Sequence, residues 1–295
     1  MAEVYIAARR ESLLRTQNVD GGWGYFPGKA SWLEPTAYAV LALHGNEKSP
    51  EAIQRALRLI KSWQLPDGSW RPGSQVQDGT WVTALAVTVC GVENILDAPF
   101  SRGLGYLLQT IGAETRTFAR VMRWFGLGEV EFDVDHTGWP WRGGTSSWVE
   151  PTVHTLIALK RARRLVNDSR IGQRIRSGEQ MLLGRQCHDG GWNHGARRAF
   201  QIDLPSYPET TGLGLLGLQG RKEGQGVVTV ARRLLESADG PLAKAWITIA
   251  LRVWGESVAP PDPGAKPGRD TMLNALQAMA HPAGNYGLFN TGASS

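Results

Sequence analysis

Gln17-Asn18-Val19-Asp20-Gly21-Gly22-Trp23 is the stretch that decides the fold, because the chain repeats it. A shift of 47 residues gives Gln64-Leu65-Pro66-Asp67-Gly68-Ser69-Trp70, and a shift of 169 gives Gln186-Cys187-His188-Asp189-Gly190-Gly191-Trp192. A fixed spacing of this kind is the mark of a supersecondary unit that is used several times. We therefore predict a repeat protein in which each unit passes through the same turn.

Each turn leads to a helix that is predicted to be buried. The first is Trp32-Leu33-Glu34-Pro35-Thr36, which a shift of 116 residues places on Trp148-Val149-Glu150-Pro151-Thr152. A third version, Tyr207-Pro208-Glu209-Thr210-Thr211, begins six residues later than the repeat predicts. Proline is favoured in the first turn of a helix, and the apolar residues that follow cover nearly every face. The segments before the turns are amphipathic instead, which predicts helices with one exposed face.

Alternation of amphipathic outer helices with apolar inner helices favours a closed ring. We predict an all-α protein, a single α/α toroid of about twelve helices over residues 1–295, with a frayed tail from about Gly284. The loops from outer to inner helices are long and lie on one face, where functional residues are expected. The predicted helices are 3–16, 36–43, 51–63, 84–90, 98–109, 114–126, 151–164, 171–186, 208–219, 227–237, 242–254 and 269–280.

Composition is consistent with one large soluble domain. The chain has 295 residues, 42% of them hydrophobic, with a net charge of +5 and two cysteines, too few for a disulfide framework. Basic residues are mostly scattered, which disfavours nucleic acid as a partner. The one dense run, Lys160-Arg161-Ala162-Arg163-Arg164, follows an apolar helix and is expected to complement its C-terminal dipole. With no signal-peptide or membrane-length apolar run, a cytoplasmic protein is expected.

The repeated Gln-x-x-x-Gly-x-Trp pattern resembles the QW motif of squalene–hopene cyclases and related terpene cyclases. This superfamily also includes the β subunits of protein prenyltransferases. The resemblance covers residues from about 10 to 220. In the cyclases these Gln and Trp residues tie the outer helices together, so the resemblance implies structural staples at Gln17, Trp23, Gln64, Trp70, Gln186 and Trp192.

The cyclases begin their reaction with an Asp-x-Asp-Asp-Thr-Ala motif at the head of an inner helix, whose middle Asp protonates an alkene. Here Thr36-Ala37 match the Thr-Ala, and Glu34 stands at the place of the middle Asp. Asp133-Val134-Asp135-His136-Thr137 spells a similar motif, but the repeat places it on the Gln–Trp turn. We expect a loop there, and we retain Asp135 as an alternative acid.

Glu34, Glu150 and Glu209 occupy the same place in three units, which allows two interpretations. Each could stabilise the start of its own helix through free N–H groups and the dipole. Alternatively, one of them is a catalytic acid, kept neutral by burial or by a neighbouring carboxylate. His154, one turn after Glu150, is a further candidate that could hold the proton of that acid. No converging Asp, Cys and His set predicts zinc, and no cofactor is expected.

The resemblance implies an isoprenoid cyclase that protonates an alkene and stabilises the carbocation on aromatic faces. The residues expected to line the site are Trp32, Tyr38, Trp81, Trp148 and Tyr207. The alternative is a non-catalytic isoprenoid-binding or partner subunit, with a prenyltransferase β-like subunit as a third hypothesis. The ligand would be an apolar isoprenoid-type molecule, and a second protein subunit and a peripheral membrane contact stay open.

Overall fold

The computed structural model describes residues 2–115, 136–199 and 201–292. Its α-helices are α1 (Ala2–Thr16), α2 (Leu33–Leu43), α3 (Pro50–Ser62), α4 (Val82–Val92), α5 (Ala98–Gln109), α7 (Val149–Leu165), α8 (Ser169–Gly184), α9 (Pro208–Gly217), α10 (Gly224–Ser237), α11 (Pro241–Val253) and α12 (Thr271–Ala280). Ala113–Thr115 and Asn285–Phe289 form short 3₁₀ helices, η1 and η2. Most of the helix predicted at 114–126 lies outside the described residues.

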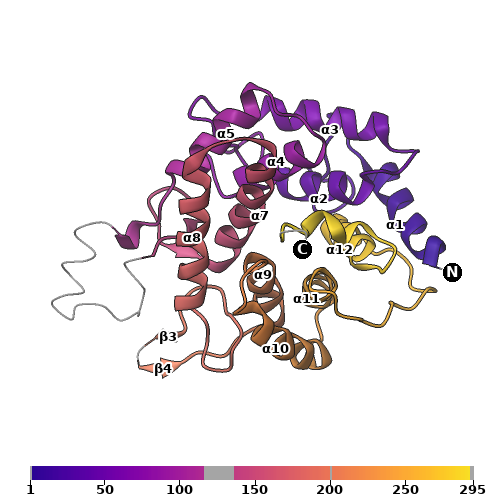
Figure 1. The fold of residues 1–295 in the computed structure, drawn as a ribbon. Helices are drawn as coiled ribbons and strands as arrows, with labels where there is room; N and C mark the ends of the chain where they lie inside the picture. Colours follow the sequence, from indigo (N-terminus) through magenta and orange to yellow (C-terminus); the bar gives the residue numbers. More distant parts are fainter. Residues whose placement is uncertain (1, 116–135, 200, 293–295) are drawn as a thin grey trace.

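Six of the described helices form a closed inner ring. In order around the ring they are α2, α4, α7, α9, α11 and α12, and each packs against the next (Figure 1). The ring closes because α12 also packs against α2. Nearly every residue of α2 and α4 is buried, as expected for helices that are apolar all round. The prediction of an all-α toroid is confirmed.

Five of the described helices, α1, α3, α5, α8 and α10, cover the ring from outside. Each buries only one side: α3, for example, buries Ala52, Ile53, Ala56, Leu57 and Ile60 and exposes its charged face. The alternation fails once. Between α11 and α12 the described chain, residues 254–270, contains no helix, so two inner helices follow one another.

The repeated tryptophans join each outer helix to the following inner helix. The indole N–H groups of Trp23, Trp70 and Trp192 donate to carbonyls near the end of the preceding outer helix at 2.7–2.8 Å. Their backbone N–H groups donate to a threonine hydroxyl in the first turn of the inner helix, at 2.9–3.0 Å. Trp139 makes the same two kinds of contact, to Leu107 and Thr152, although its turn has lost the Gln and the Gly.

Two of the three repeated glutamines join neighbouring outer helices, whereas the amide of Gln186 donates only within its own turn, to Gly190 O at 2.8 Å, among the described residues. The side-chain amides of Gln17 and Gln64 each donate to a carbonyl of their own turn and to one in the first turn of the next outer helix, at 2.7–3.0 Å. The glycine of the turn is required by space as well as by its φ of +92° at Gly21, since a Cβ there would lie 2.8 Å from the Arg55 backbone. These contacts fix the long loops that precede the inner helices. We call the end of the ring that these loops surround the mouth.

Residues 284–292, which we call the C-terminal segment, are packed against the ring, which corrects the expectation of a frayed tail from Gly284. Phe289 is buried, and the side chain of Gln219 both donates to the carbonyl of Phe289 and accepts from the N–H of Thr291. Arg161 and Arg164 of the basic run donate to carbonyls of this segment. The mostly polar sequence of this segment did not indicate that Phe289 would be buried. Arg161 and Arg164, which were expected to complement a helix dipole, bind carbonyls of this segment instead.

Short strands complete the loop face. β1 (Trp139–Pro140) pairs antiparallel with β2 (Ser147–Trp148), and β3 (Arg198–Ala199) pairs with β4 (Ile202–Asp203). The β1–β2 pair ends at the start of α7 and so places Trp148 at that helix start. None of the helices in the described part of the chain is both long and apolar enough to span a bilayer.

Candidate active site

Three glutamates converge where the inner helices begin. Glu34, Glu150 and Glu209 lie in the first turns of α2, α7 and α9, and all three are partly buried. They are close enough for the charge of Glu34 and Glu209 to act on Glu150. We call this set the glutamate cluster. The ring symmetry of the repeat brings together residues that lie 116 and 175 positions apart in the chain.

The glutamates do not cap their own helices. Within the part of the chain that the structure describes, no backbone N–H donates to any of the three carboxyls. Glu34 instead accepts a hydrogen bond from the hydroxyl of Tyr25, while the carboxyl of Glu150 has neither a hydrogen bond nor an ion pair to a described residue. Helix-start N–H groups are taken by other partners, such as the N–H of Val149, which donates to His194 O at 3.0 Å. The interpretation as a set of capping residues is therefore not supported.

The environment separates the acidities of these groups. Burial raises the pKa of Glu150 to about 8, and the charges of Glu34 and Glu209 add to the effect. Burial also raises the pKa of Glu34, but the hydrogen bond from Tyr25 opposes this by stabilising the ionised carboxylate. For Glu209, burial raises the pKa and His194 lowers it. Glu150 is thus the member of the cluster that holds a proton near neutral pH.

Aromatic side chains surround the cluster. The residues that immediately precede the inner helices α2, α4, α7 and α9 are Trp32, Trp81, Trp148 and Tyr207. A pocket of about 340 Å³ opens beside Glu34. It is lined by Tyr25, Trp32, Glu34, Pro72, Thr80, Trp81, Val82, Trp141 and Arg142. This volume falls at the lower end of the range of roughly 300–1,000 Å³ for small-molecule sites.

The predicted lining residues do not all reach this pocket. Trp32 and Trp81 do, whereas Tyr207 is 45% exposed and lies across the mouth, its ring 5.6 Å from that of His194. Trp148 is half-buried, and its ring covers Gly195. Tyr38 is fully buried below the mouth. Of the predicted binding residues, Trp32 and Trp81 therefore line the pocket, Trp148 and Tyr207 lie outside its lining, and Tyr38 is buried in the core.

His154 lies beneath the glutamates within an aromatic group. Its Nε2 is 3.2 Å from the Tyr38 hydroxyl, and its ring centroid is 5.2 Å from Trp81 and 5.7 Å from Trp246. Burial lowers the pKa of His154 to about 3, so the imidazole is neutral at physiological pH. It cannot supply a positive charge to hold Glu150, and it acts as a polar member of the floor.

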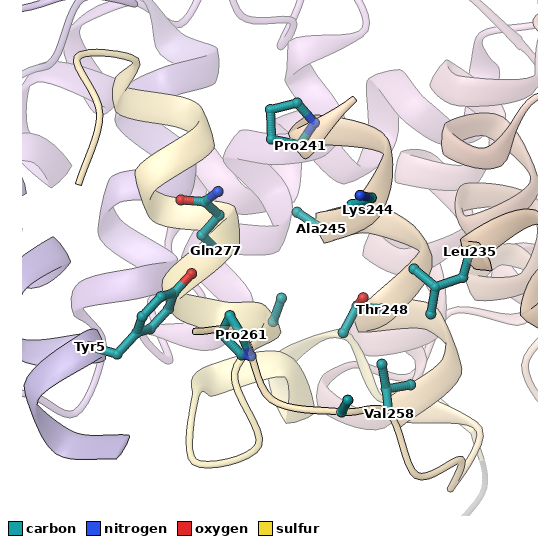
Figure 2. Close-up of a pocket in the computed structure, with 11 residues that line it drawn as sticks. Tyr5, Leu235, Pro241, Lys244, Ala245, Thr248, Val258, Pro261 and Gln277 are labelled. Carbon is teal, nitrogen blue, oxygen red and sulfur yellow. The ribbon is translucent and has the colours of Figure 1, made fainter. Parts of the chain in front are cut away.

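Other candidates carry less chemistry. Asp135, the alternative acid, lies outside the described residues. Among the described residues, no group of three His, Cys, Asp or Glu side chains could hold a metal ion. A second pocket of about 360 Å³ lies on the outer wall between α1, α11 and residues 258–261 (Figure 2). Its lining contains Lys244 but neither Asp nor Glu, so it offers no carboxylic acid to protonate an alkene.

Sequence reasoning missed Tyr25, Trp141 and Trp246. The first two stand two positions after a repeat tryptophan, and the 116-residue shift maps Tyr25 onto Trp141. His194 holds the same place after Trp192. That register could have identified them as a set facing the mouth. Trp246 belongs to α11, which lacks the repeat turn, so no register pointed to it.

Comparison with known proteins identifies the fold. No protein-family profile matches the chain. A stretch of 59 residues is 49% identical to drimenyl diphosphate synthase of Streptantibioticus cattleyicolor, covering 20% of this chain and 11% of that enzyme. This chain thus matches only a small part of its curated relative's length.

Solved structures match over almost the whole chain. The type II terpene cyclase MstE from Scytonema, in complex with its product merosterolic acid A, has a TM-score of 0.58 at 16% identity, covering 94% of this chain and 77% of that one. The family 8 glycosyl hydrolase Cel10 of Klebsiella pneumoniae, an endoglucanase, has a TM-score of 0.62 at 14% identity, covering 93% and 97%. The resemblance to the terpene cyclases is confirmed at the level of the fold: the chain is an α/α toroid of the architecture that type II terpene cyclases share with these glycoside hydrolases.

Proposed function

We propose that this protein is a terpene cyclase-like enzyme that binds an isoprenoid at the mouth of its toroid and cyclises it by protonating an alkene. The observation that carries the proposal is Glu150: a partly buried carboxyl without a partner among the described residues, raised in pKa to about 8 and set near two further carboxyls. An acid that must be protonated when its substrate arrives needs this kind of environment.

Two of the three carboxyls would take different roles. Glu150 gives its proton to the terminal double bond, so that a C–H bond forms and the neighbouring carbon becomes a cation. The next double bond attacks this cation and closes a ring. The final cation loses a proton to water, and the Glu150 carboxylate takes up a proton from solvent, so the charges balance. Glu34, which accepts a hydrogen bond from Tyr25, and the faces of Trp81 and Trp141 stabilise the positive charge.

The comparisons support this proposal without deciding it. Fold alone does not identify function, and the toroid of the glycoside hydrolases shows this directly. In favour of a cyclase are the local match to drimenyl diphosphate synthase and the structure of MstE with geranylgeranyl dihydroxybenzoate, its substrate. This chain aligns with 76% of the MstE chain in that complex, at 17% identity.

A second candidate, a non-catalytic isoprenoid-binding or partner subunit, is favoured by one observation. Tyr38, His154, Trp246 and Phe289 fill the middle of the ring and are all buried, and the pocket beside Glu34 is lined by neither Glu150 nor Glu209. A small-molecule partner that is apolar and isoprenoid-like fits both candidates. For both candidates we also propose a cytoplasmic location, and we retain a second protein subunit and a peripheral membrane contact as proposed partners.

The test is turnover in deuterated water. Purified protein is incubated with farnesyl diphosphate, geranylgeranyl diphosphate and squalene, and products are analysed by mass spectrometry. We expect a cyclic isomer that carries one solvent deuteron, and no such product from Glu150→Gln. Binding of the same compounds, followed by tryptophan fluorescence, separates the alternatives: binding without product supports the binding subunit, and absence of binding rejects both candidates.

A further inference from the structure

The C-terminal segment closes the end of the ring opposite the glutamates. After α12 the chain crosses the C-terminal ends of the inner helices, where the side-chain amide of Asn285 donates to the carbonyls of Leu41 and His44 at 3.1 and 2.8 Å. Gln219, just after α9, holds the carbonyl of Phe289 at 2.8 Å and the N–H of Thr291 at 2.7 Å. The segment is therefore attached to opposite sides of the ring.

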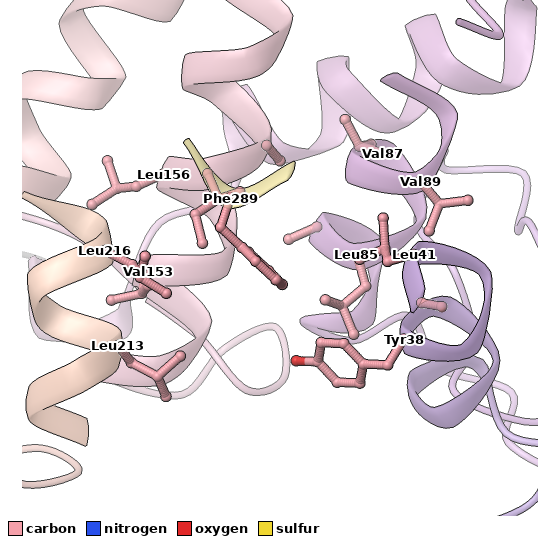
Figure 3. Close-up of a cluster of buried hydrophobic side chains, with 14 of the residues drawn as sticks. Tyr38, Leu41, Leu85, Val87, Val89, Val153, Leu156, Leu213, Leu216 and Phe289 are labelled. Atoms are coloured by element: carbon pink, nitrogen blue, oxygen red, sulfur yellow. The ribbon is translucent and has the colours of Figure 1, made fainter. Parts of the chain in front are cut away.

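Phe289 enters the ring from this segment. It is 2% exposed, and its ring centroid is 5.6 Å from that of Trp246. In Figure 3 the Phe289 side chain points into the space between the inner helices, with Leu85 on one side and Val153 and Leu216 on the other. It occupies the middle of the toroid, although it does not belong to the ring itself.

An aromatic column connects Phe289 to the mouth pocket. Trp81 lines that pocket, His154 lies 5.2 Å from Trp81, Trp246 lies 5.7 Å from His154, and Phe289 follows at 5.6 Å. The first three residues come from helices α4, α7 and α11 or their first turns and are fixed by helix packing. Phe289 alone among these four comes from a short segment that covers the ring, so its size can change without separating two helices.

We propose that Phe289 is the floor residue that limits how long an isoprenoid chain this toroid accepts. The inference rests on the proposed function, because it takes the mouth pocket as the entry for the chain. A smaller residue at 289 leaves a space below Trp246 into which the indole can move, and the pocket deepens along the ring axis. Space enclosed by apolar side chains binds apolar groups.

The test compares chain-length preference in matched variants. Binding of farnesol, geranylgeraniol and squalene is measured by fluorescence for the wild type, Phe289→Ala, Phe289→Leu and Phe289→Trp. We expect Phe289→Ala to shift the preference toward the longer chains by about tenfold, since each additional buried methylene contributes roughly 0.8 kcal/mol. Phe289→Leu should give a smaller shift in the same direction, and Phe289→Trp should favour farnesol.

Phe100→Ala is the matched control. Phe100 is 1% exposed but belongs to the outer helix α5, so the same truncation removes as much core and leaves the ring centre intact. An unchanged chain-length preference in folded Phe289→Leu and Phe289→Trp would overturn the inference, as would an equal shift in Phe100→Ala. If the wild type binds none of the three compounds, the proposed function fails instead. A wild type that binds while its variants keep its preference leaves the proposed function intact.

Discussion

The end of the ring where the inner helices begin differs from the end where they finish. At the first end, Glu34 and Glu209 are close enough for their charges to act on Glu150, and partly exposed aromatic residues precede the same helices. At the other end, Asn285, Gln219 and Arg161 satisfy carbonyls of the inner helices or of the C-terminal segment, and Phe289 fills the centre. At the first end the carboxyl of Glu150 has no partner among the described residues. The other end is held by these hydrogen bonds, although Arg161 Nε and Thr291 Oγ1 are buried there without a partner among the described residues.

This difference shows where chemistry can take place in a symmetric scaffold. A hydrogen-bonded and filled end contributes stability, since buried polar groups with partners are not costly. The glutamate end bears the cost of crowding three carboxyls, which is typical of a functional site. Four experiments test this contrast.

The largest effect is expected at Glu150. Glu150→Gln should lower turnover of an isoprenoid by about 10²–10⁴-fold, because the proton donor is lost while the size and shape of the side chain remain. Glu209→Gln is the matched control and should retain far more activity. Rates come from product formation, and thermal unfolding checks the fold. Equal losses in the two variants would show that the cluster acts only as a charge and that Glu150 is not the donor.

The next largest effect, on the free energy of unfolding, is expected at the repeated tryptophan turns. Trp192→Ala should lower the free energy of unfolding by roughly 3–5 kcal/mol, since the indole is fully buried and its N–H binds Leu182 O at 2.7 Å. Trp32→Ala, at a residue 37% exposed on the rim, should cost much less. Denaturant unfolding measures both. A loss below about 1 kcal/mol at Trp192 would contradict the role of this residue as a staple.

A substitution at the closed end should lower the free energy of unfolding by a smaller amount. Gln219→Ala removes the acceptor for Thr291 and the donor for Phe289 O, both buried, and should cost about 1–3 kcal/mol. Hydrogen exchange should accelerate at the amide of Thr291, with little change at the amides of the mouth. If the mouth exchanges faster too, the two ends are coupled and the contrast between them is weaker than proposed.

The last effect, small within any one pH unit, is a pH dependence of stability. The folded protein holds a proton on Glu150 up to a pKa of about 8, while the unfolded chain releases it near 4.5. Stability from this group is complete below the lower value and should fall between the two as pH rises, by on the order of 1 kcal/mol per unit. Glu34 and Glu209 shift in the same direction. Glu150→Gln should flatten the curve measured by urea unfolding, and an unchanged slope would argue against a protonated Glu150.

Much of this architecture is determined by the sequence alone. The Gln–Gly–Trp spacing depends on local geometry, because one turn, one indole and one amide must reach partners a fixed number of residues away. The repeat therefore located the outer and inner helices, the staples, and the three equivalent glutamates. It could not show that residues 254–270 replace an outer helix, because that segment carries no repeat.

Only the tertiary structure decided how these residues act. The pKa of Glu150 depends on burial and on carboxyls from two other helices, and none of these contacts is local in the chain. Tyr25 selects Glu34 as the hydrogen-bonded member, and His154 becomes neutral because it is enclosed. Phe289 lies in a mostly polar stretch of the sequence, and only the closed ring shows that its side chain is buried. Periodicity specifies which residues are equivalent, whereas long-range packing decides which of them are charged, bonded or buried.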